Sequence, residues 1–392
     1  MTIETDIIII GAGIAGASAA SILAETASVI VLEQEAHAGY HATGRSAATW
    51  APVYGPPAIQ ELTRLSRQAL CAPPASLGGV PFTSPRGEML LGRHGDEAEI
   101  ECSKESGMES ISIEQAKQRV PLIRFDKVST VLYYEDMLSV DVDALHQAYL
   151  KKYRANAGTI VCNAAVTSLE YKNNNWYVTT PSNSYCAPVV INAAGAWADK
   201  VAALAGARSL KLQPKRRSAA LVPFAENSNM NTWPMIFSAG ETFYCTPFGN
   251  GMMISPADET AVEPHDAWPD DGDLAGAIDT FEQYIDYNVP KITHSWAGLR
   301  TFAPDGDPVV GFDPDIEGFF WLAGQGGYGI QTSPAMAVLS ARLVNEYRNG
   351  KKLLSTKYAD NNASNTELAE LSAGTIDHFA KRLSPSRPGL GT

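Results

Sequence analysis

The sequence predicts an α/β (α+β) protein, because two kinds of strand pattern share the chain. An uncharged, β-branched run at Ile7–Ile10 leads into a glycine-rich turn and an apolar helix, and later runs at Val189–Asn192 and Gly318–Gly324 are equally apolar. Such runs are typical of parallel strands that are covered on both faces. The stretches 85–139 and 214–290 instead hold many Tyr, Trp, Phe and Met residues and alternate as antiparallel strands do. We therefore expect a parallel sheet with helices and a second, mixed antiparallel sheet.

The start of the chain has the pattern of a βαβ unit. A strand over Asp6–Ile10 is followed by the turn Gly11–Gly16, a helix that runs through Ser18–Leu23, and a strand over Ser28–Leu32 that ends at Glu33. No basic region precedes this apolar stretch, and three glycines interrupt it. We therefore expect neither a targeting segment nor a membrane span.

A helix in the middle of the chain has clear boundaries. Asp141 or Asp143 can cap it, and its apolar residues follow helical spacing. Gly158 ends this helix before a short strand over Thr159–Val161.

A further helix follows the tight loop Gly326–Gly329. Thr332 or Ser333 is its expected cap, and Pro334 is expected in its first turn. The polar tail after Ser355 is expected to have little regular structure.

The chain length of 392 residues exceeds what one hydrophobic core usually serves, so two domains are expected. The parallel-strand pattern returns far from the first unit, which indicates that the second domain is inserted twice. We predict a first domain of residues 1–84, 140–213 and 291–392 and a second domain of residues 85–139 and 214–290.

Composition and charge exclude several classes of function. Charged residues make up 19% of the chain, below the roughly 25% of an average soluble protein, and apolar residues make up 45%, so the chain is not disordered. A net charge of -13 opposes general attraction to nucleic acid and to anionic lipid. The five cysteines form no CxxC pair, and no metal-ligand set is evident among the seven histidines. We expect a cytoplasmic protein without a nucleic-acid partner and without a metal.

The turn after the first strand carries Gly11-x-Gly13-x-x-Gly16, a weak signal by itself. Its context makes it more specific, because it follows a strand, opens a helix and is completed by Glu33 at the end of the next strand. The helix amino terminus would face a pyrophosphate, and Glu33 would accept hydrogen bonds from a ribose diol. An acid at position 33 disfavours the 2′-phosphate of NADP. The fingerprint alone leaves FAD and NAD open.

Six motifs occur along the chain in a set order. They are Gly11–Gly16, Gly39–Ser46, Asn192–Trp197, Gly298–Arg300, Asp305–Gly311 and Gly326–Ile330. Together they resemble the flavoenzyme family of D-amino acid oxidase, glycine oxidase and sarcosine oxidase, over residues 3 to 347. Within this family the chain is similar to the FAD-dependent D-arginine dehydrogenases, through residues 212–218 and 294–300.

This resemblance implies a D-amino acid oxidase-like fold, in which the first domain binds FAD and the second binds the substrate. It also implies non-covalent FAD, since no cysteine stands where the sarcosine oxidases attach their flavin. The helix after Gly329 would present its amino terminus to the flavin, and Val166 would touch the adenine. The residues expected to bind the cofactor are Gly11, Ala12, Gly13, Ile14, Ala15, Gly16, Glu33, Gln34, His41, Thr43, Gly44, Arg45, Ser46, Ala47, Ala48, Val166, Ala194, Gly195, Trp197, Arg300, Gly327, Tyr328, Gly329, Ile330, Gln331 and Thr332.

The resemblance also implies a site for a carboxylate, bound by Arg300 and Tyr244. A guanidinium group binds a carboxylate through two parallel hydrogen bonds, which fix its orientation. Arg217 is a further basic residue with two interpretations, either a member of this site or a solvated arginine beside Lys215 and Arg216.

The other end of the substrate is expected at Glu88, which matches the carboxylate that D-arginine dehydrogenase places opposite a cationic side chain. The alternative is a surface charge at the start of a strand. Tyr54 corresponds to the lid tyrosine of that enzyme. The remaining residues expected at the substrate are Thr49, Met235, Phe237, Gly298 and Gln331.

Two of these residues depart from the pattern of the D-arginine dehydrogenases. Thr49 stands in place of a histidine, and Phe237 replaces an aliphatic residue. The loss of an imidazole and the gain of a phenyl ring mean that substrate range and pH dependence do not carry over.

The expected activity is FAD-dependent oxidative deamination of D-amino acids, with basic or large apolar side chains such as those of D-Arg and D-Lys. Hydride transfer to flavin N5 would lead to a 2-oxo acid and ammonia. The electron acceptor, quinone or oxygen, is left open. The alternatives are an FAD oxidase of another amine or of a 2-hydroxy acid, in the manner of sarcosine or glycine oxidase, and a non-catalytic nucleotide-binding protein.

Overall fold

The computed structural model describes residues 2–226, 228–351 and 371–391. Its strands form sheets of four, six, ten and three strands. The six-stranded sheet has the order β10 (Thr159–Val161), β3 (Val29–Leu32), β2 (Ile7–Ile10), β14 (Val189–Asn192), β22 (Phe319–Ala323) and β21 (Val309–Phe312).

The first five of these strands are parallel to one another, and β21 pairs antiparallel with β22. Every residue of β2, β3, β14 and β22 is buried. The expectation of apolar parallel strands covered on both faces is confirmed for these runs.

Alternate residues of β2 belong to two different cores. Ile7 and Ile9 pack with α1 (Ile14–Leu23), α5 (Val142–Ala155) and α8 (Gly329–Gly350) on one face of the sheet. Ile8 and Ile10 pack on the other face with α6 (Ala198–Leu204) and the four-stranded sheet. That sheet has the order β1 (Thr2–Glu4), β13 (Ser184–Ala187), β12 (Asn175–Thr179) and β11 (Ser168–Lys172). The parallel sheet is therefore the middle one of three layers.

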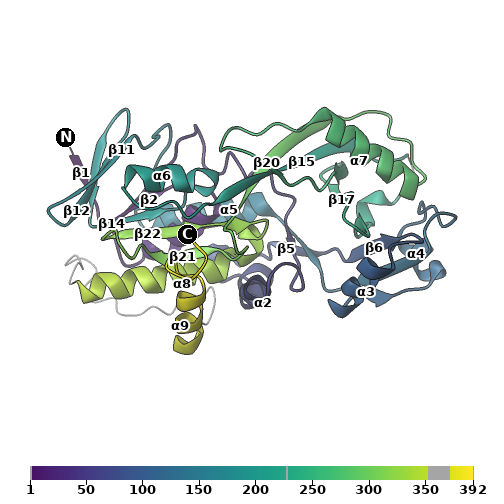
Figure 1. The fold of residues 1–392 in the computed structure, drawn as a ribbon, viewed down its shortest axis with the longest axis horizontal. Helices are drawn as coiled ribbons and strands as arrows, with labels where there is room; N and C mark the ends of the chain where they lie inside the picture. The colour runs from purple at the N-terminus through teal and green to yellow at the C-terminus, as the bar shows by residue number, and fades with distance from the viewer. Residues whose placement is uncertain (1, 227, 352–370, 392) are drawn as a thin grey trace.

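The ten-stranded sheet is antiparallel except where β16 pairs in parallel with β6, so it is a mixed sheet as predicted. Its order is β23 (Gln325–Gly326), β20 (His294–Phe302), β15 (Gln213–Pro223), β18 (Gly251–Ser255), β17 (Tyr244–Phe248), β16 (Met235–Ser238), β6 (Glu88–Gly92), β8 (Thr130–Tyr134) and β7 (Glu109–Ser110), with β19 (Thr260–Ala261) beside β15. Figure 1 shows the long strands β15 and β20 running from the parallel sheet to the other end of the molecule.

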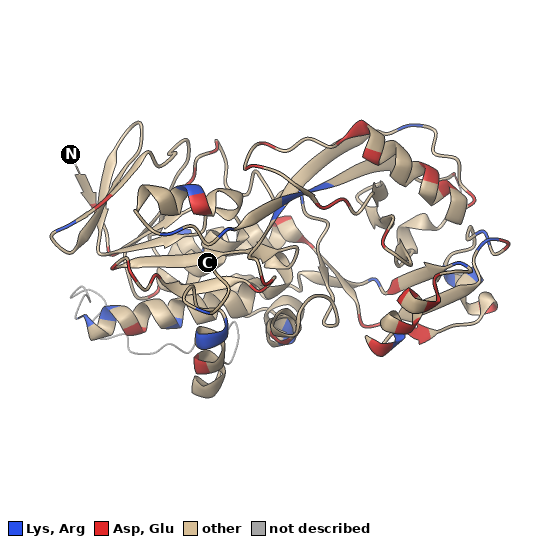
Figure 2. Cartoon of the chain, in the orientation of Figure 1, with Lys and Arg blue, Asp and Glu red and all other residues tan. Residues whose placement is uncertain are grey.

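Helices cover the ten-stranded sheet at its far end. Phe281 of α7 (Asp271–Tyr284) and Ala116 of α4 (Ile113–Arg119) share a core with this sheet, and Ile100 of α3 (Glu97–Glu105) packs on β6 and β8. Acidic residues are frequent on α3 and α7 (Figure 2). Among the described helices, none is both long enough and apolar enough to cross a membrane.

A small sheet joins the two larger ones, with the order β4 (Thr49–Trp50), β9 (Leu138–Val140) and β5 (Thr83–Pro85); α2 (Pro57–Cys71) follows β4. The sheets bear on the expected division of the chain. The segment 291–392 was assigned to the first domain, but its strand β20 pairs along its whole length with β15 of the ten-stranded sheet. The domain boundaries themselves stay a prediction.

The start of α8 differs from the prediction. The helix begins at Gly329, so Thr332 and Ser333 do not cap it, and Pro334 lies inside it. Both hydroxyls bond back within the helix, Thr332 to the carbonyl of Tyr328 and Ser333 to that of Ile330, each at 2.9 Å. Pro334 has no N–H for the carbonyl of Ile330, and the Ser333 hydroxyl takes that place.

The carboxyl-terminal tail also differs in part. Residues 373–382 form the helix α9 (Ala373–Arg382), which Ser372 caps and whose Phe379 is fully buried. The expectation of little regular structure is therefore wrong for this helix. The rest of that expectation falls largely on residues 356–370, which lie outside the described residues.

The cap of α5 gives a stability prediction. Asp141, rather than Asp143, accepts a hydrogen bond from the backbone N–H of Ala144, at 2.9 Å. Asp141→Ala should lower the free energy of unfolding by about 1 kcal/mol. Asp143→Ala should cost only about 0.3 kcal/mol, through the helix dipole. Urea-unfolding midpoints measure both, and equal losses would contradict the assignment.

Candidate active site

A cavity of about 530 Å³ lies between the carboxyl ends of the parallel strands and one face of the ten-stranded sheet. The turn after β2, the loop 39–49, the loop after β14 and the start of α8 line it on one side. Strands β6, β15, β16, β17 and β20 line the other side. The carboxyl ends of parallel strands are the usual place for a ligand in such folds.

The turn after β2 is wound so tightly that only glycine fits. Gly11 has φ +104°, and a Cβ there would lie 2.5 Å from the carbonyl oxygen of Ala193. A Cβ on Gly16 would lie 1.9 Å from the carbonyl oxygen of Gly11. Gly13 is the N-cap of α1 and has no capping side chain, and it lines the cavity. The positive end of α1 is therefore directed at the cavity.

Glu33 lies at the same edge of the sheet, and its side chain is almost fully buried. One carboxylate oxygen accepts the N–H of Ala12 at 2.8 Å, and the other accepts the N–H of Glu35 at 3.0 Å. Each oxygen keeps a further lone pair. Glu33 lines the cavity, so it is placed to accept hydrogen bonds from a diol.

The loop 39–48 is tied to the start of α1. The hydroxyl of Thr43 accepts the N–H of Ile14 at 2.9 Å, and Gly44 closes the loop by donating to the carbonyl of Gly39 at 2.7 Å. Arg45 lines the cavity, but its guanidinium is bound to Asp266 and to the carbonyls of Ala267 and Ala297. Arg45 thus has less freedom to bind a phosphate than the sequence suggested.

The start of α8 also borders the cavity, through Gly329, Ile330 and Gln331. Gln331 is 3% exposed, and its side-chain oxygen accepts the N–H of Ala51 at 3.1 Å. Besides Arg217 Nε, three buried polar atoms of the cavity lining have no hydrogen-bond partner within the described part of the chain. They are Gln331 Nε2, Gln325 Nε2 and Thr301 Oγ1.

Arg300 projects from β20 beside this helix end. A Cβ on Gly327 would lie 3.1 Å from its Cζ, so a larger residue there would displace the guanidinium. Burial opposes the charge, but Tyr244, Tyr54 and Glu259 outweigh it and raise the pKa of Arg300 above its ordinary value. The side chain therefore stays cationic. No carboxylate of the described residues forms an ion pair with it.

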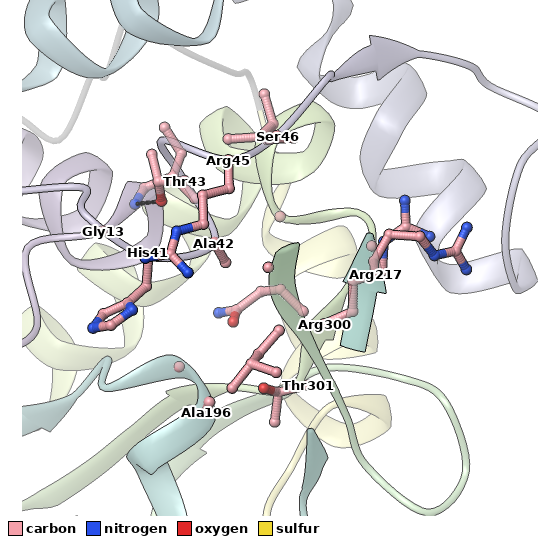
Figure 3. A pocket seen from close by; sticks show the side chains of 18 of the residues that line it. Gly13, His41, Ala42, Thr43, Arg45, Ser46, Ala196, Arg217, Arg300 and Thr301 are labelled. Carbon is pink, nitrogen blue, oxygen red and sulfur yellow. Dashed lines mark hydrogen bonds between the residues drawn. The ribbon is translucent and has the colours of Figure 1, made fainter. Parts of the chain in front are cut away.

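Arg217 lies on the neighbouring strand β15, opposite Gly298 of β20. Figure 3 shows Arg217 and Arg300 at one side of the cavity and the loop with Thr43 and Arg45 at the other. Arg217 forms an ion pair with Glu259 at 3.0 Å, while its Nε is buried without a partner. Of the two arginines, Arg300 is the one whose charge is free for a ligand.

One sheet face carries the remaining expected substrate residues. Glu88 lies beside Met235 across β6 and β16, and Phe237 lies beside Tyr244 across β16 and β17. Met235 and Phe237 are two residues apart on one strand, so their side chains share a face. All four line the cavity.

Glu88 lies on this face without a partner among the described residues. No hydrogen bond or ion pair from the described residues reaches it. Burial, and then the nearby charge of Glu241, raise the pKa of Glu88 to about 7. A carboxylate in this condition is stabilised by a cation that enters the cavity.

Most of the residues predicted for the site line this one cavity. Five of them do not. Gly16 and Gly44 each allow another stretch of backbone to approach closely, and the N–H of Ala12 donates to Glu33. The hydroxyl of Thr332 bonds within α8, and Tyr328 packs against Tyr54 with ring centroids 5.1 Å apart.

Several lining residues were not predicted, among them Lys200, Glu241, Trp296, Thr301 and Gln325. Glu241 sits in the turn between β16 and β17 with φ +50°, a conformation that no sequence pattern indicated. Gln325 and Thr301 adjoin predicted residues, so a search of neighbouring positions would have found them. The roles of all these residues stay predictions.

The residues present fit FAD. The glycine turn makes room for a backbone-bound pyrophosphate, Glu33 suits a ribose, and the unpartnered polar atoms near α8 suit the polar edge of a flavin. The chain matches the family FAD dependent oxidoreductase (DAO) over residues 6–343.

The chain belongs to this family. The predicted fold class and the predicted cofactor, FAD, are thereby confirmed. Non-covalent attachment of the FAD stays a prediction.

Several known proteins are similar to this member of the family. FAD-dependent oxidoreductase domain-containing protein 1 of Xenopus laevis is 30% identical over 187 residues, which cover 42% of this chain and 36% of that protein. The match thus spans about a third of that relative's length. Glycine oxidase of Bacillus subtilis is 22% identical over 277 residues, 69% of this chain and 72% of the enzyme.

Among solved structures, glycine oxidase from Geobacillus kaustophilus has a TM-score of 0.77 at 20% identity, with 88% of this chain and 95% of that chain covered. At this identity the likeness shows the fold alone.

The glycine turn gives a cofactor-binding prediction. Gly11→Ala should weaken FAD binding about 100-fold, because strain at a positive φ and the contact with Ala193 both distort the turn. Gly78→Ala is the matched control, since Gly78 has φ +98° but no neighbour within 4 Å of a Cβ. Flavin absorbance per protein after purification measures the effect. Equal flavin content in both variants would contradict the assignment.

Proposed function

We propose that this chain is an FAD-dependent dehydrogenase or oxidase of D-amino acids, with a preference for cationic side chains. One observation carries the proposal. A single cavity holds a cationic Arg300 and a carboxylate, Glu88, and neither forms an ion pair with another described residue. A substrate with a carboxylate at one end and a cation at the other complements both.

Arg300 and Tyr244 bind the substrate carboxylate in this proposal. Arg300 keeps its charge, and its fork of donors suits two parallel hydrogen bonds. The guanidinium of Arg217 lies 5.9 Å from the Tyr244 ring centroid and is paired with Glu259. In this proposal Arg217 therefore positions Tyr244 and does not bind the substrate carboxylate directly. The similarity to glycine oxidase supports an amino-acid substrate.

Glu88 selects the side chain of the substrate. A guanidinium or ammonium group next to it gains a partner, whereas an apolar side chain gains none from Glu88 in either protonation state. Met235 and Phe237 line the path between the two ends and pack on an alkyl chain. The resemblance to the D-arginine dehydrogenases and the many acidic residues of α3 and α7 agree with this preference (Figure 2).

Tyr54 covers the carboxylate end. Tyr54 is 38% exposed and packs edge-on against Tyr328, and its side-chain oxygen accepts a hydrogen bond from Arg300. A substrate carboxylate that replaces this hydrogen bond leaves Tyr54 as a lid that excludes water.

The chemistry needs little from the protein beyond binding and orientation. FAD, when bound, accepts a hydride from the carbon that carries the amine. Arg300 and Tyr244 fix the carboxylate, and Glu88 fixes the far end, so the α-carbon is held at one position between them. Gln331 Nε2 and the amino end of α8 supply donors on the cofactor side.

Anaerobic reduction of the bound flavin tests the proposed activity. D-Arg and D-Lys should bleach the flavin fastest, D-Met more slowly, and sarcosine and lactate least. Arg300→Met should slow every D-amino acid by about 1000-fold, since it removes a charge that binds the carboxylate. Reduction by sarcosine or lactate and by no D-amino acid would overturn the proposal.

The pKa of Glu88 gives a pH prediction. Above pH 7 the carboxylate is ionised and binds a cation, and below pH 7 it is neutral. The ratio of kcat/KM for D-Arg to that for D-Met should therefore rise about tenfold between pH 6 and pH 8. The ratio cancels the ionisation of the α-amine, which both substrates share.

Two variants check that this profile belongs to Glu88. Glu88→Gln should flatten the ratio and lower it at pH 8 by about 100-fold. Glu241→Gln removes a charge that raises the pKa of Glu88, so the midpoint of the pH dependence of this ratio should move below pH 7. A profile unchanged in Glu88→Gln would refute the role.

A further inference from the structure

The loop 39–46 is held from outside the cavity by a segment more than 200 residues away. Asp266 lies between β19 and α7, and one of its carboxylate oxygens accepts a hydrogen bond from Arg45 at 2.5 Å. The other accepts the hydroxyl of Tyr40 at 3.2 Å. Arg45 also donates to the carbonyls of Ala267, at 3.1 Å, and Ala297, at 2.9 Å.

We propose that Asp266 is a positioning residue for the cofactor, which keeps FAD in place by locking the loop 39–46 over the cavity through Arg45. We call the set Asp266, Ala267, Ala297, Tyr40 and Arg45 the Asp266 clasp. This inference concerns cofactor retention and is independent of the proposed substrate.

Tyr40 and Arg45 of the clasp line the cavity, whereas Asp266 does not. His41 lines the cavity as well, so a displacement of this loop changes the lining of the cavity. Figure 3 shows His41 and Arg45 projecting from the loop next to Thr43. Asp266 therefore acts on the cofactor only through the side chains that it holds.

The loop 39–46 contacts the dinucleotide-binding turn and other elements around the cavity. Thr43 accepts the N–H of Ile14 at the start of α1, at 2.9 Å. His41 binds Glu35 at 2.9 Å and packs on Trp197 with ring centroids 4.5 Å apart. Trp296 of β20 donates to the carbonyl of Arg45 at 3.0 Å. Loss of the clasp would thus loosen the contacts of the loop with α1, with Trp197 and with β20.

The charges of the clasp explain why a carboxylate is needed at position 266. The Arg45 side chain is 15% exposed, and Asp266 is its one ion-pair partner among the described residues. The hydrogen bond from Arg45 lowers the pKa of Asp266 below its ordinary value, which shows that the pair stabilises the ionised form. Without this partner the largely buried guanidinium of Arg45 keeps only its two carbonyl acceptors, so the loop is held less firmly.

The test measures release of FAD from the holoenzyme after dilution, by the fluorescence of free FAD. Asp266→Asn should raise the dissociation rate about tenfold. Asp266→Glu should restore at least part of the retention. Glu263→Gln removes a charge from the same segment without touching the clasp, so it should release FAD at the wild-type rate.

A double variant separates the clasp from a general loss of stability. In the background Arg45→Met, the further change Asp266→Asn should add less than about twofold to the rate, because the contact with Arg45 is already lost and only the weaker contact with Tyr40 remains. A further tenfold increase of the FAD dissociation rate in that background would overturn the proposal. A dissociation rate of Asp266→Asn equal to that of Glu263→Gln would overturn it as well.

Discussion

The close approach between Gly11 and Gly16 is the constraint on which the site depends. A Cβ on Gly16 would lie 1.9 Å from the carbonyl oxygen of Gly11, so the chain can turn from β2 into α1 only without side chains there. This turn directs the amino end of α1 at the cavity. The backbone of Ala12 is then held from both sides, by Glu33 at its N–H and by buried His146 at its carbonyl. Burial lowers the pKa of His146, so the ring remains a neutral donor.

The second constraint is electrostatic. Arg300 and Glu88 are both withdrawn from water within one cavity, and neither finds an ion-pair partner in the described chain. Such groups cost stability unless a ligand completes them. The protein thus holds a cation, Arg300, and a carboxylate, Glu88, at separate places in the lining of one cavity. A ligand with the complementary charges interacts favourably with both groups. The unpaired charges therefore lower the stability of the free protein and make ligand binding selective.

Local patterns predicted what local physics determines. The runs at Ile7–Ile10 and Val189–Asn192 were recognisable as buried parallel strands because β-branched residues without polar alternation fit few other environments. Gly11, Gly13 and Glu33 were identifiable because their spacing follows from the turn itself. The cap of α8 was misplaced because a hydroxyl near a helix start can either cap the helix or bond back within it, as Thr332 does.

Contacts between distant segments could not be predicted in the same way. Asp266 meets Arg45 only because β20 and the loop after β19 fold back over the cavity, and nothing near either residue signals the pair. Glu241 reaches the cavity through a turn with positive φ, which a glutamate seldom adopts. Both residues change the electrostatics of the site, Asp266 by neutralising Arg45 and Glu241 by raising the pKa of Glu88.

Proton release on ligand binding tests the central claim, that Glu88 awaits a cation at the far end of the cavity. Calorimetric titration at pH 7 in two buffers of different ionisation enthalpy would compare 5-guanidinopentanoate, which is arginine without its α-amine, with hexanoate. A carboxyl group with a pKa of about 7 is half protonated there, so the guanidino acid should release about half a proton per site. Hexanoate should release none. Equal proton release by the two ligands would contradict the account.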